Sequence, residues 1–287
     1  MRFAFLLILL LLTLDATGAV TKETTRLKVG STDVRVNVYH NPASDITFFV
    51  PHHNERSAVA LAREFVASRG GRLVEIESFD AKGNPSRMVR ISKNGREFTV
   101  DPNRLFTENG RSCGLPTEIR DDAAKFAAEL LDIVFGSNEA EFRSSGRMIV
   151  AVHNNADVDG KASGAKKNDI TAIAFSSAAG SSHMFHEQAA GVFLSNAEDD
   201  ADNFVFLSTP QHLAYFAGFG FNAVVQRPAA ALASKQCSID DGSMSVYSGK
   251  NSIEYICLEA DAGSGEIRHR QMFESVYDLA ARRAAGR

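Results

Sequence analysis

The segment His52-His53-Asn54-Glu55 follows the largely apolar run Ile46–Val50 and a proline in the sequence. An imidazole and a carboxylate three residues apart, at the exit of a buried strand, can turn toward the same point. His52 and Glu55 are therefore candidates for two of the three protein ligands of a catalytic zinc ion, whose fourth position is left to water. His53 is the ligand in an alternative register. The competing interpretation is a polar loop that caps the next helix, with Glu55 near its positive end.

A third zinc ligand is expected at the end of another buried strand. The run Arg147–Val152 (RMIVAV) is apolar after its first residue and is followed by His153. Taken alone, His153 is better explained as a structural imidazole with satisfied hydrogen bonds. Because two separate strand ends each deliver such groups, a shared metal site is the favoured interpretation.

Between these two segments the chain contains Asp101-Pro102-Asn103-Arg104. Asp-Pro favours a turn. Asn103 and Arg104 add an amide and a forked guanidinium, which suit a carboxylate ligand. On its own, this segment is explained by an exposed surface turn. Beside the two histidine segments, it becomes a candidate for binding a substrate carboxylate.

Three motifs in this order, HHNE, VDPNRLF and AVHNN, resemble the zinc carboxypeptidase superfamily. They are also similar to its succinylglutamate desuccinylase and aspartoacylase branch, which typically shows H-G-N-E and D-L-N-R-x-F. The resemblance implies zinc ligands at His52, Glu55 and His153. It also implies that Asn103 and Arg104 anchor a substrate carboxylate. Asp101 would orient His52, because metal-bound imidazoles usually need such a partner.

The resemblance also implies a catalytic carboxylate and an arginine that polarises the scissile carbonyl. The segment SIEYICLEAD resembles the last strand of the family, which ends in the catalytic glutamate. We expect Glu259, at the exit of this strand, to act as general base and then as general acid. Glu254, inside the strand, is the weaker candidate. Arg96 is expected to polarise the carbonyl, as in the desuccinylases, with Arg87 and Arg90 as competitors in a more carboxypeptidase-like placement.

The elements that must position these groups alternate between strands and helices, which indicates a three-layer α/β domain. Strands are predicted at residues 33–40, 46–50, 72–76, 88–92, 147–152, 170–175, 203–207, 222–226 and 252–258, and helices at 57–68, 117–135 and 272–283. The resemblance implies a phosphorylase/hydrolase-like α/β/α arrangement with a mixed central sheet. In such sheets the reacting groups usually lie just beyond the carboxyl ends of strands.

The beginning of the chain predicts export. Arg2 precedes an apolar run at residues 3–12, and the small residues at 16–19 are typical of a signal-peptide cleavage region. We expect residues 1–19 to be removed, leaving one secreted or periplasmic hydrolase domain over residues 20–287. An insertion is predicted between about 157 and 245, because the stretch from His153 to Glu259 is long for the family.

Composition excludes several other classes of protein. A net charge of -4 leaves no basic footprint for a nucleic-acid partner. No later apolar run approaches the length of a membrane span. Three cysteines are too few for a disulfide-built scaffold. In an oxidising compartment Cys237 and Cys257 could pair, which would leave Cys113 free.

Together these observations predict an exported, zinc-dependent hydrolase that cleaves an amide bond next to a free carboxylate. A metallocarboxypeptidase that acts on a small peptide is the leading interpretation, because free acylated amino acids are chiefly intracellular. A desuccinylase-like or aspartoacylase-like deacylase of N-acyl amino acids is the alternative within this class. A non-catalytic binding protein on the same fold is the alternative from another class.

Overall fold

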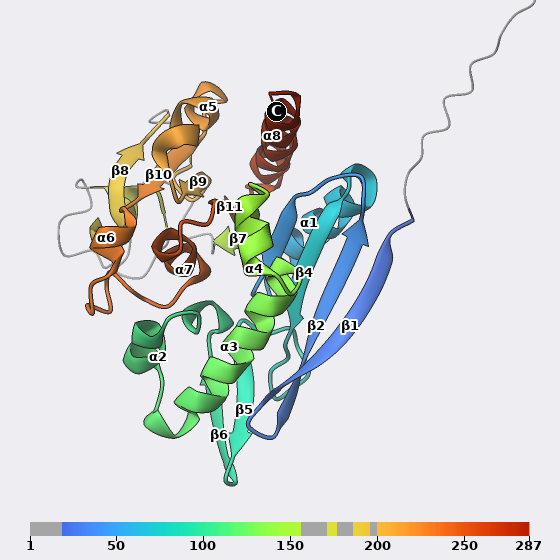
Figure 1. Ribbon diagram of the computed structural model, residues 1–287, viewed down its shortest axis with the longest axis vertical. Coiled ribbons are helices and arrows are strands. Elements are labelled where there is room, and N and C mark those ends of the chain that lie inside the picture. Colours follow the sequence, from blue (N-terminus) through green and yellow to red (C-terminus); the bar gives the residue numbers. More distant parts are fainter. Residues whose placement is uncertain (1–18, 156–170, 177–185, 196–199, 287) are drawn as a thin grey trace, which may run out of the picture.

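The computed structural model describes residues 19–155, 171–176, 186–195 and 200–286. Over these ranges a mixed nine-stranded sheet forms the middle layer, in the order β1-β2-β4-β3-β7-β11-β9-β10-β8 (Figure 1). Its strands are β1 (Thr21–Val29), β2 (Thr32–Asn41), β3 (Thr47–Val50), β4 (Gly71–Glu77), β7 (Ile149–Asn155), β8 (Ala189–Phe193), β9 (Phe204–Leu207), β10 (Asn222–Gln226) and β11 (Tyr255–Asp261). A separate two-stranded sheet pairs β5 (Val89–Lys93) with β6 (Arg96–Val100).

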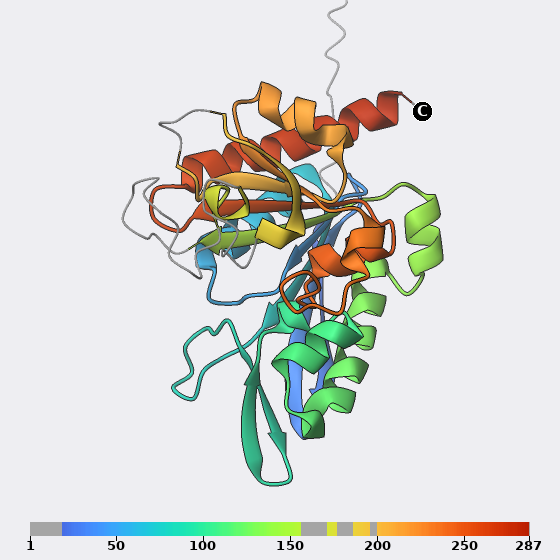
Figure 2. The same ribbon diagram turned by 90° about the vertical axis from the view of Figure 1, so that its left-hand side faces the viewer.

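The helices form the two outer layers. They are α1 (Arg56–Arg69), α2 (Glu108–Gly114), α3 (Arg120–Phe135), α4 (Glu139–Ser144), α5 (Leu213–Gly218), α6 (Ala229–Leu232), α7 (Met244–Lys250) and α8 (Glu266–Ala285). Figure 2 shows α5 and α8 on one side of the sheet and α3 on the other. The architecture is therefore the predicted three-layer α/β/α arrangement with a mixed sheet.

Each face of the sheet has its own apolar core. On α1 the buried residues Ala58, Leu61, Ala62 and Phe65 recur at helical spacing. They pack with α8, where the ring of Phe273 stacks on that of Phe65 at 4.7 Å between centroids. The opposite core contains the buried side chains of α3 together with those of β1, β2 and β5.

Three parallel neighbours, β3, β7 and β11, occupy the middle of the sheet. Residues of β3 pair with β7 from Thr47 onward, and β11 pairs with β7 along its whole length. All four residues of β3 are buried, as expected for a strand that is covered on both faces. Because the three strands run in the same direction, their carboxyl ends meet at one edge of the sheet. This edge carries the segments that begin at His52 and His153.

Several boundaries differ from the prediction. Residues 173–175 form a 3-10 turn instead of a strand, and residue 170 lies outside the described ranges. The last strand covers 255–261 instead of 252–258, so Glu259 lies inside it and Glu254 precedes it. The last helix begins at Glu266, before the predicted residue 272.

The disulfide joins Cys113 to Cys237, which corrects the predicted pairing of Cys237 with Cys257. Cys113 lies in α2, and the loop after α6 brings Cys237 against it with 5.8 Å between the Cα atoms. Cys257 instead lies in the middle of β11, where its side chain is buried and carries a free thiol.

The predicted signal peptide lies, except for its last residue, outside the described ranges, as do parts of the predicted insertion. The described part of that insertion contains β8, β9 and β10, which extend the main sheet beyond β11. Within the ranges given above, no helix is both long enough and apolar enough to span a bilayer.

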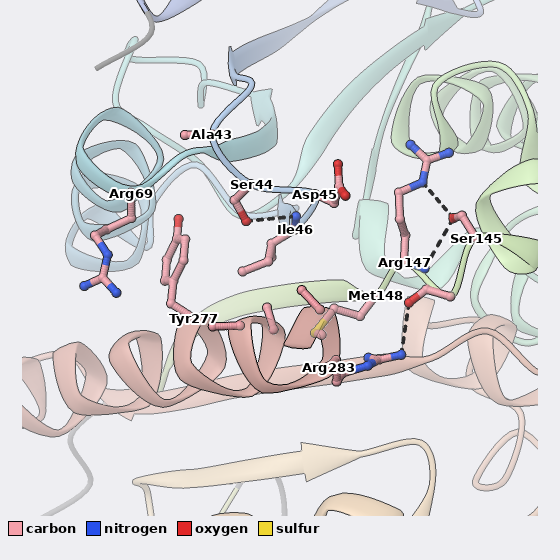
Figure 3. A pocket seen from close by; sticks show the side chains of 14 residues that line it. Ala43, Ser44, Asp45, Ile46, Arg69, Ser145, Arg147, Met148, Tyr277 and Arg283 are labelled. Atoms are coloured by element: carbon pink, nitrogen blue, oxygen red, sulfur yellow. Dashed lines mark hydrogen bonds between the residues drawn. The ribbon is translucent and has the colours of Figure 1, made fainter. Parts of the chain in front are cut away.

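A hollow of about 350 Å³ lies at the amino ends of β3 and β7, the edge opposite His52 (Figure 3). Its lining includes Asp45 and three arginines, Arg69, Arg147 and Arg283, but neither a histidine nor a cysteine. Among the described residues, the groups of three side chains that could together hold a metal ion lie instead near the other edge of the sheet.

Candidate metal centre

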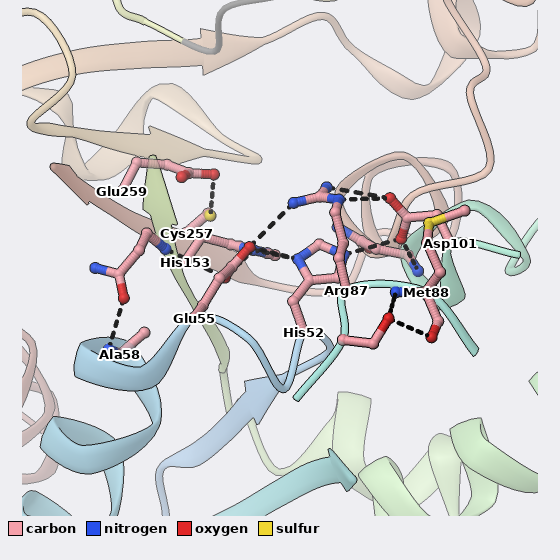
Figure 4. Close-up of polar contacts among 12 residues, drawn as sticks. His52, Glu55, Ala58, Arg87, Met88, Asp101, His153, Cys257 and Glu259 are labelled. Carbon is pink, nitrogen blue, oxygen red and sulfur yellow. Dashed lines mark hydrogen bonds and ion pairs between the residues drawn. The ribbon is translucent and has the colours of Figure 1, made fainter. Parts of the chain in front are cut away.

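His52, Glu55 and His153 converge at the carboxyl edge of the sheet. β3 ends at Val50, and the short loop behind it carries His52 and then Glu55, the N-cap position of α1. The Glu55 side chain makes no capping hydrogen bond. It turns away from the helix and faces His153 of β7 (Figure 4). Glu55 therefore occupies the N-cap position, but its side chain does not cap the helix.

The distances between the three donors suit one small cation. His52 Nδ1 lies 2.7 Å from Glu55 Oε1 and 3.1 Å from His153 Nδ1, and His153 Nδ1 lies 3.0 Å from Glu55 Oε2. Ligands of a tetrahedral zinc ion with bonds of about 2.0 Å stand about 3.3 Å apart. At most one of the two facing Nδ1 atoms can carry a proton. A group of two imidazoles and one carboxylate, all buried, is a donor set that zinc accepts.

Asp101 fixes the orientation of His52. Its Oδ1 lies 2.9 Å from His52 Nε2 and also accepts a hydrogen bond from the backbone N–H of Asn103. This contact at Nε2 leaves Nδ1 as the atom that faces Glu55 and His153. Burial raises the pKa of Asp101, but the charges of His52, Arg104 and Arg87 outweigh it and hold this pKa well below its usual range. Asp101 therefore contacts the nitrogen of His52 that faces away from Glu55 and His153.

The charges around Glu55 and His52 favour a bound cation. Burial opposes charge on both, yet the pKa of Glu55 lies well below its ordinary value because His52 and His153 face it. The pKa of His52 is raised because the charges of Glu55 and Asp101 outweigh the effect of burial. The centre therefore holds a carboxylate that stays ionised and an imidazole that attracts positive charge.

Arg87 is the arginine that the structure brings to this centre. Its guanidinium donates to Glu55 Oε1 at 3.0 Å and to Asp101 Oδ2 at 3.1 Å, and about a third of the side chain is exposed. Arg96, the expected residue, lies at the start of β6, where it is largely exposed and pairs with Glu118 at 2.8 Å. The assignment to Arg96 is corrected, because the β5–β6 hairpin carries this side chain away from the metal ligands.

Arg90, His53 and Glu254 also lie away from the donors. Arg90 pairs with Glu97 across the β5–β6 hairpin. His53 Nδ1 lies 2.8 Å from the carbonyl oxygen of Ser78, so this histidine is not in the donor set. Glu254 precedes β11 and contacts His212 and Arg283. Because five residues of a strand span roughly 17 Å, Glu254 is at the far end of β11 from Glu259.

Glu259 is the carboxylate that lies beside the ligands. It is the register partner of His153 in the neighbouring strand, and 7% of its surface is exposed. Cys257 Sγ lies 3.4 Å from its Oε1, and Oε2 has no hydrogen-bond partner in the described part of the chain. Burial raises the pKa of Glu259 and the charge of Glu55 adds to this, while His153 opposes it. A carboxyl group in this position is suited to accept and return a proton.

Asn103 and Arg104 lie in the 3-10 turn that follows Asp101. Asn103 Oδ1 accepts a hydrogen bond from the backbone N–H of Met244 at the start of α7, so its carbonyl has a structural role. Arg104 Nη1 donates to the backbone oxygen of Asn103, and its Nε lies 3.6 Å from Asp241. Burial lowers the pKa of Arg104, but carboxylates that include Asp241, Asp101 and Glu259 raise it above the ordinary value.

The loop that carries Asp241 is held close to this turn by glycines. Gly242 has φ +80°, and a Cβ there would lie 2.3 Å from the backbone oxygen of Arg104. Gly110 of α2 approaches Gly242 equally closely, with 2.1 Å between an added Cβ and the Gly242 Cα. The backbone of Arg104 therefore packs so closely against Gly242 that no side chain fits at position 242.

Cys257 was not predicted to be part of the centre. It precedes Glu259 by two residues in a strand, so both side chains point to the same face of the sheet. With the strand placed at 255–261, the alternation of side chains in YICLE predicts that Cys257 and Glu259 share one face. Arg87 was named as a competitor, but nothing in its sequence neighbourhood distinguished it from Arg90.

No family model and no curated protein matches the chain. Among solved structures, a Shewanella baltica protein provisionally described as a metallopeptidase aligns with a TM-score of 0.44 and 12% identity, over 90% of this chain and 86% of that chain. An aspartoacylase family protein from Mesorhizobium loti aligns with a TM-score of 0.36 and 12% identity, over 90% and 67%. The similarity is too low to transfer either neighbour's activity to this chain.

Proposed function

We propose that this chain is an exported zinc-dependent hydrolase that cleaves an amide bond next to a free carboxylate, as a metallocarboxypeptidase does. The proposal rests chiefly on one observation, the convergence of His52 Nδ1, Glu55 and His153 Nδ1 at 2.7 to 3.1 Å with Glu259 alongside. His52, Glu55 and His153 would hold the ion. Zinc bound in such a site supplies a polarised carbonyl and a water whose pKa is lowered to about 7.

The proton transfers are assigned to Glu259. It would take the proton of the attacking water and deliver it to the leaving amine, which requires a carboxyl group that is stable in both protonation states. The raised pKa of Glu259 supports this role, as does its Oε2, which has no hydrogen-bond partner among the described residues. We expect Glu259→Gln to lower kcat by about 10²- to 10⁴-fold, the usual contribution of a general base, without loss of bound zinc. Full activity of this variant in a steady-state assay would move the base elsewhere.

Two arginines would complete the site. Arg87, which contacts Glu55 and Asp101, would donate to the developing oxyanion. Arg104 would bind the substrate carboxylate through the part of its guanidinium that does not contact Asn103. Asn103 supports this turn by its hydrogen bond to Met244, and it is a weaker candidate for direct contact.

Export is part of the proposal. It is supported by the basic and apolar start of the chain and by the Cys113–Cys237 disulfide, which suits an oxidising compartment. Amino-terminal sequencing of the protein purified from the extracytoplasmic fraction should begin near residue 19 or 20. An intact amino terminus at Met1 in that fraction would contradict signal removal.

Substrate choice separates the peptidase from the deacylase. The zinc-loaded protein should hydrolyse short peptides with a free carboxyl terminus and leave the same peptides untouched when this terminus is amidated. N-acyl amino acids, including N-succinyl and N-acetyl forms, are tested in parallel, and preferential hydrolysis of these would establish the deacylase. No hydrolysis of either class at high protein concentration would support a non-catalytic binding protein instead.

A further inference from the structure

Cys257 is the cysteine that remains outside the disulfide, and it lies beside the candidate metal centre. Tyr255, Cys257 and Glu259 alternate along β11 and therefore share one face of the sheet. The register partner of Cys257 in β7 is Ala151. The partner of Glu259 is His153, so a thiol, a carboxylate and an imidazole occupy adjacent positions of two strands.

These three groups have the spacing of a donor set. One ligand atom each from His153, Cys257 and Glu259 lies within 4.8 Å of the other two, and all three residues are buried. Cys257 Sγ is 3.4 Å from Glu259 Oε1. For a tetrahedral ion with bonds of about 2.3 Å to sulfur and 2.0 Å to oxygen, the expected separation is about 3.5 Å.

Glu259 supplies a second, independent indication of a ligand. Its Oε2 is inaccessible to solvent and has no hydrogen-bond partner among the described residues. A buried carboxylate oxygen without a partner is costly unless a cation or a donor meets it. The thiol of Cys257 contacts the other oxygen, so it does not satisfy this one.

We propose that His153, Cys257 and Glu259 form a second, thiolate-containing cation site that is selective for a thiophilic divalent ion such as Cd²⁺. Thiolate is a soft ligand that favours such ions, whereas the set of His52, Glu55 and His153 contains nitrogen and oxygen donors alone. His153 belongs to both sets, so an ion in the second site draws on one ligand of the first. The proposal does not depend on hydrolytic activity.

The test uses the purified full-length protein with its disulfide intact and Cd²⁺ as the probe. Binding of Cd²⁺ to a thiolate releases the thiol proton to solvent and produces a ligand-to-metal charge-transfer band in the ultraviolet. Because the chain has three cysteines and two form the disulfide, this band can arise from Cys257 alone. We expect the band in the wild type and its complete loss in Cys257→Ser.

One further variant tests Glu259 as a ligand, and another serves as a control. Glu259→Gln should weaken Cd²⁺ binding, as followed by titration of the band. His52→Ala is the matched control, because it removes a donor from the first set alone and should retain the band. Circular dichroism and thermal unfolding establish that each variant is folded.

Cd²⁺ that binds the wild type without a thiolate band would overturn the proposal, as would a band that persists in Cys257→Ser. If Cys257→Ser does not fold, cadmium NMR of the wild type decides the question. A resonance in the range of sulfur-ligated cadmium supports the site, and a resonance typical of nitrogen and oxygen ligands alone contradicts it. Because all readouts report on Cd²⁺ binding, a failure of the proposed zinc hydrolysis would leave them unaffected.

Discussion

At the scale of single residues, the position of each guanidinium distinguishes Arg87 from Arg96. Arg87 contacts Asp101 and the candidate metal ligand Glu55, whereas Arg96 pairs with Glu118 on the surface. The two residues are near each other in sequence and carry the same charge. The chain therefore contains a matched pair for testing which arginine stabilises the transition state.

Arg87→Gln should lower kcat by about 10²- to 10³-fold, the usual effect of losing one oxyanion donor. Arg96→Gln should leave kcat and KM unchanged, because its guanidinium contacts no residue of the centre. Steady-state kinetics measure both variants, and zinc analysis of Arg87→Gln separates a catalytic effect from loss of the ion. A large fall in Arg96→Gln with normal Arg87→Gln kinetics would reverse the assignment.

His269 is a buried histidine that makes the stability of the fold depend on pH. It is fully buried in α8, and neither ring nitrogen has a hydrogen-bond partner within the described ranges. Burial lowers its pKa to about 3, whereas an imidazole in the unfolded chain titrates near 6.5. Between these two values the unfolded state binds a proton that the native state does not bind. His269 therefore destabilises the fold as pH falls from about 6.5 toward 3.

The His269→Leu variant should be more stable than the wild type by about 1 to 3 kcal/mol at neutral pH, because an unpaired buried polar group is removed. Its advantage should grow on acidification by up to about 1.4 kcal/mol per pH unit. Urea unfolding at several pH values measures the free energy of unfolding of both proteins. A constant difference across this pH range would show that His269 does not titrate as described.

At the scale of elements, the disulfide joins α2 to the loop that leads to α7. Asp240 and Asp241 of this loop contact Thr107 and Arg104, and Met244 behind them contacts Asn103. The covalent link therefore supports the loop that packs against the proposed carboxylate-binding turn. The strands that carry the metal ligands are held separately by the sheet.

Replacing Cys113 and Cys237 by Ser should lower the free energy of unfolding by roughly 2 to 5 kcal/mol, because the bond closes a long loop. Bound zinc should be retained, since its ligands lie on other elements. Urea titration and metal analysis measure the two effects. Non-reducing peptide mapping provides the control, and a cross-linked peptide of Cys237 with Cys257 would contradict the observed connectivity.

The elements that sequence could predict are those whose burial is visible in the residue types. The largely apolar runs 46–50 and 147–152 correspond to β3 and β7, and the helical spacing at 57–68 corresponds to α1. β1 was missed because its first six residues are all exposed and give no alternating pattern. The β5–β6 hairpin was missed as a unit, since pairing is not encoded in the pattern of either strand.

The candidate site was predictable where its residues follow buried strands, and it was not predictable where tertiary packing decides the position of a side chain. His52, Glu55 and His153 follow recognisable buried strands, and the structure brings their ligand atoms together. Arg96 was misplaced because the direction in which a hairpin carries a side chain depends on tertiary packing. Cys257 was overlooked because the boundaries of the last strand were shifted by three residues relative to 255–261.

At the scale of the whole molecule, the order of the sheet creates the centre. β3, β7 and β11 are separated by long stretches of chain but are neighbours in the sheet and run in parallel. Groups at or near their carboxyl ends must therefore meet at one edge, where His52, His153 and Glu259 lie. The outer strands extend the sheet on both sides and keep these three strands in its interior.

The central claim is that His52, Glu55 and His153 bind one zinc ion. The most direct test is an anomalous difference map at the zinc absorption edge, from crystals of the purified protein. We predict a single strong peak within bonding distance of His52 Nδ1, His153 Nδ1 and a Glu55 oxygen. Absence of a peak between these atoms, with zinc bound elsewhere or not at all, would contradict the claim.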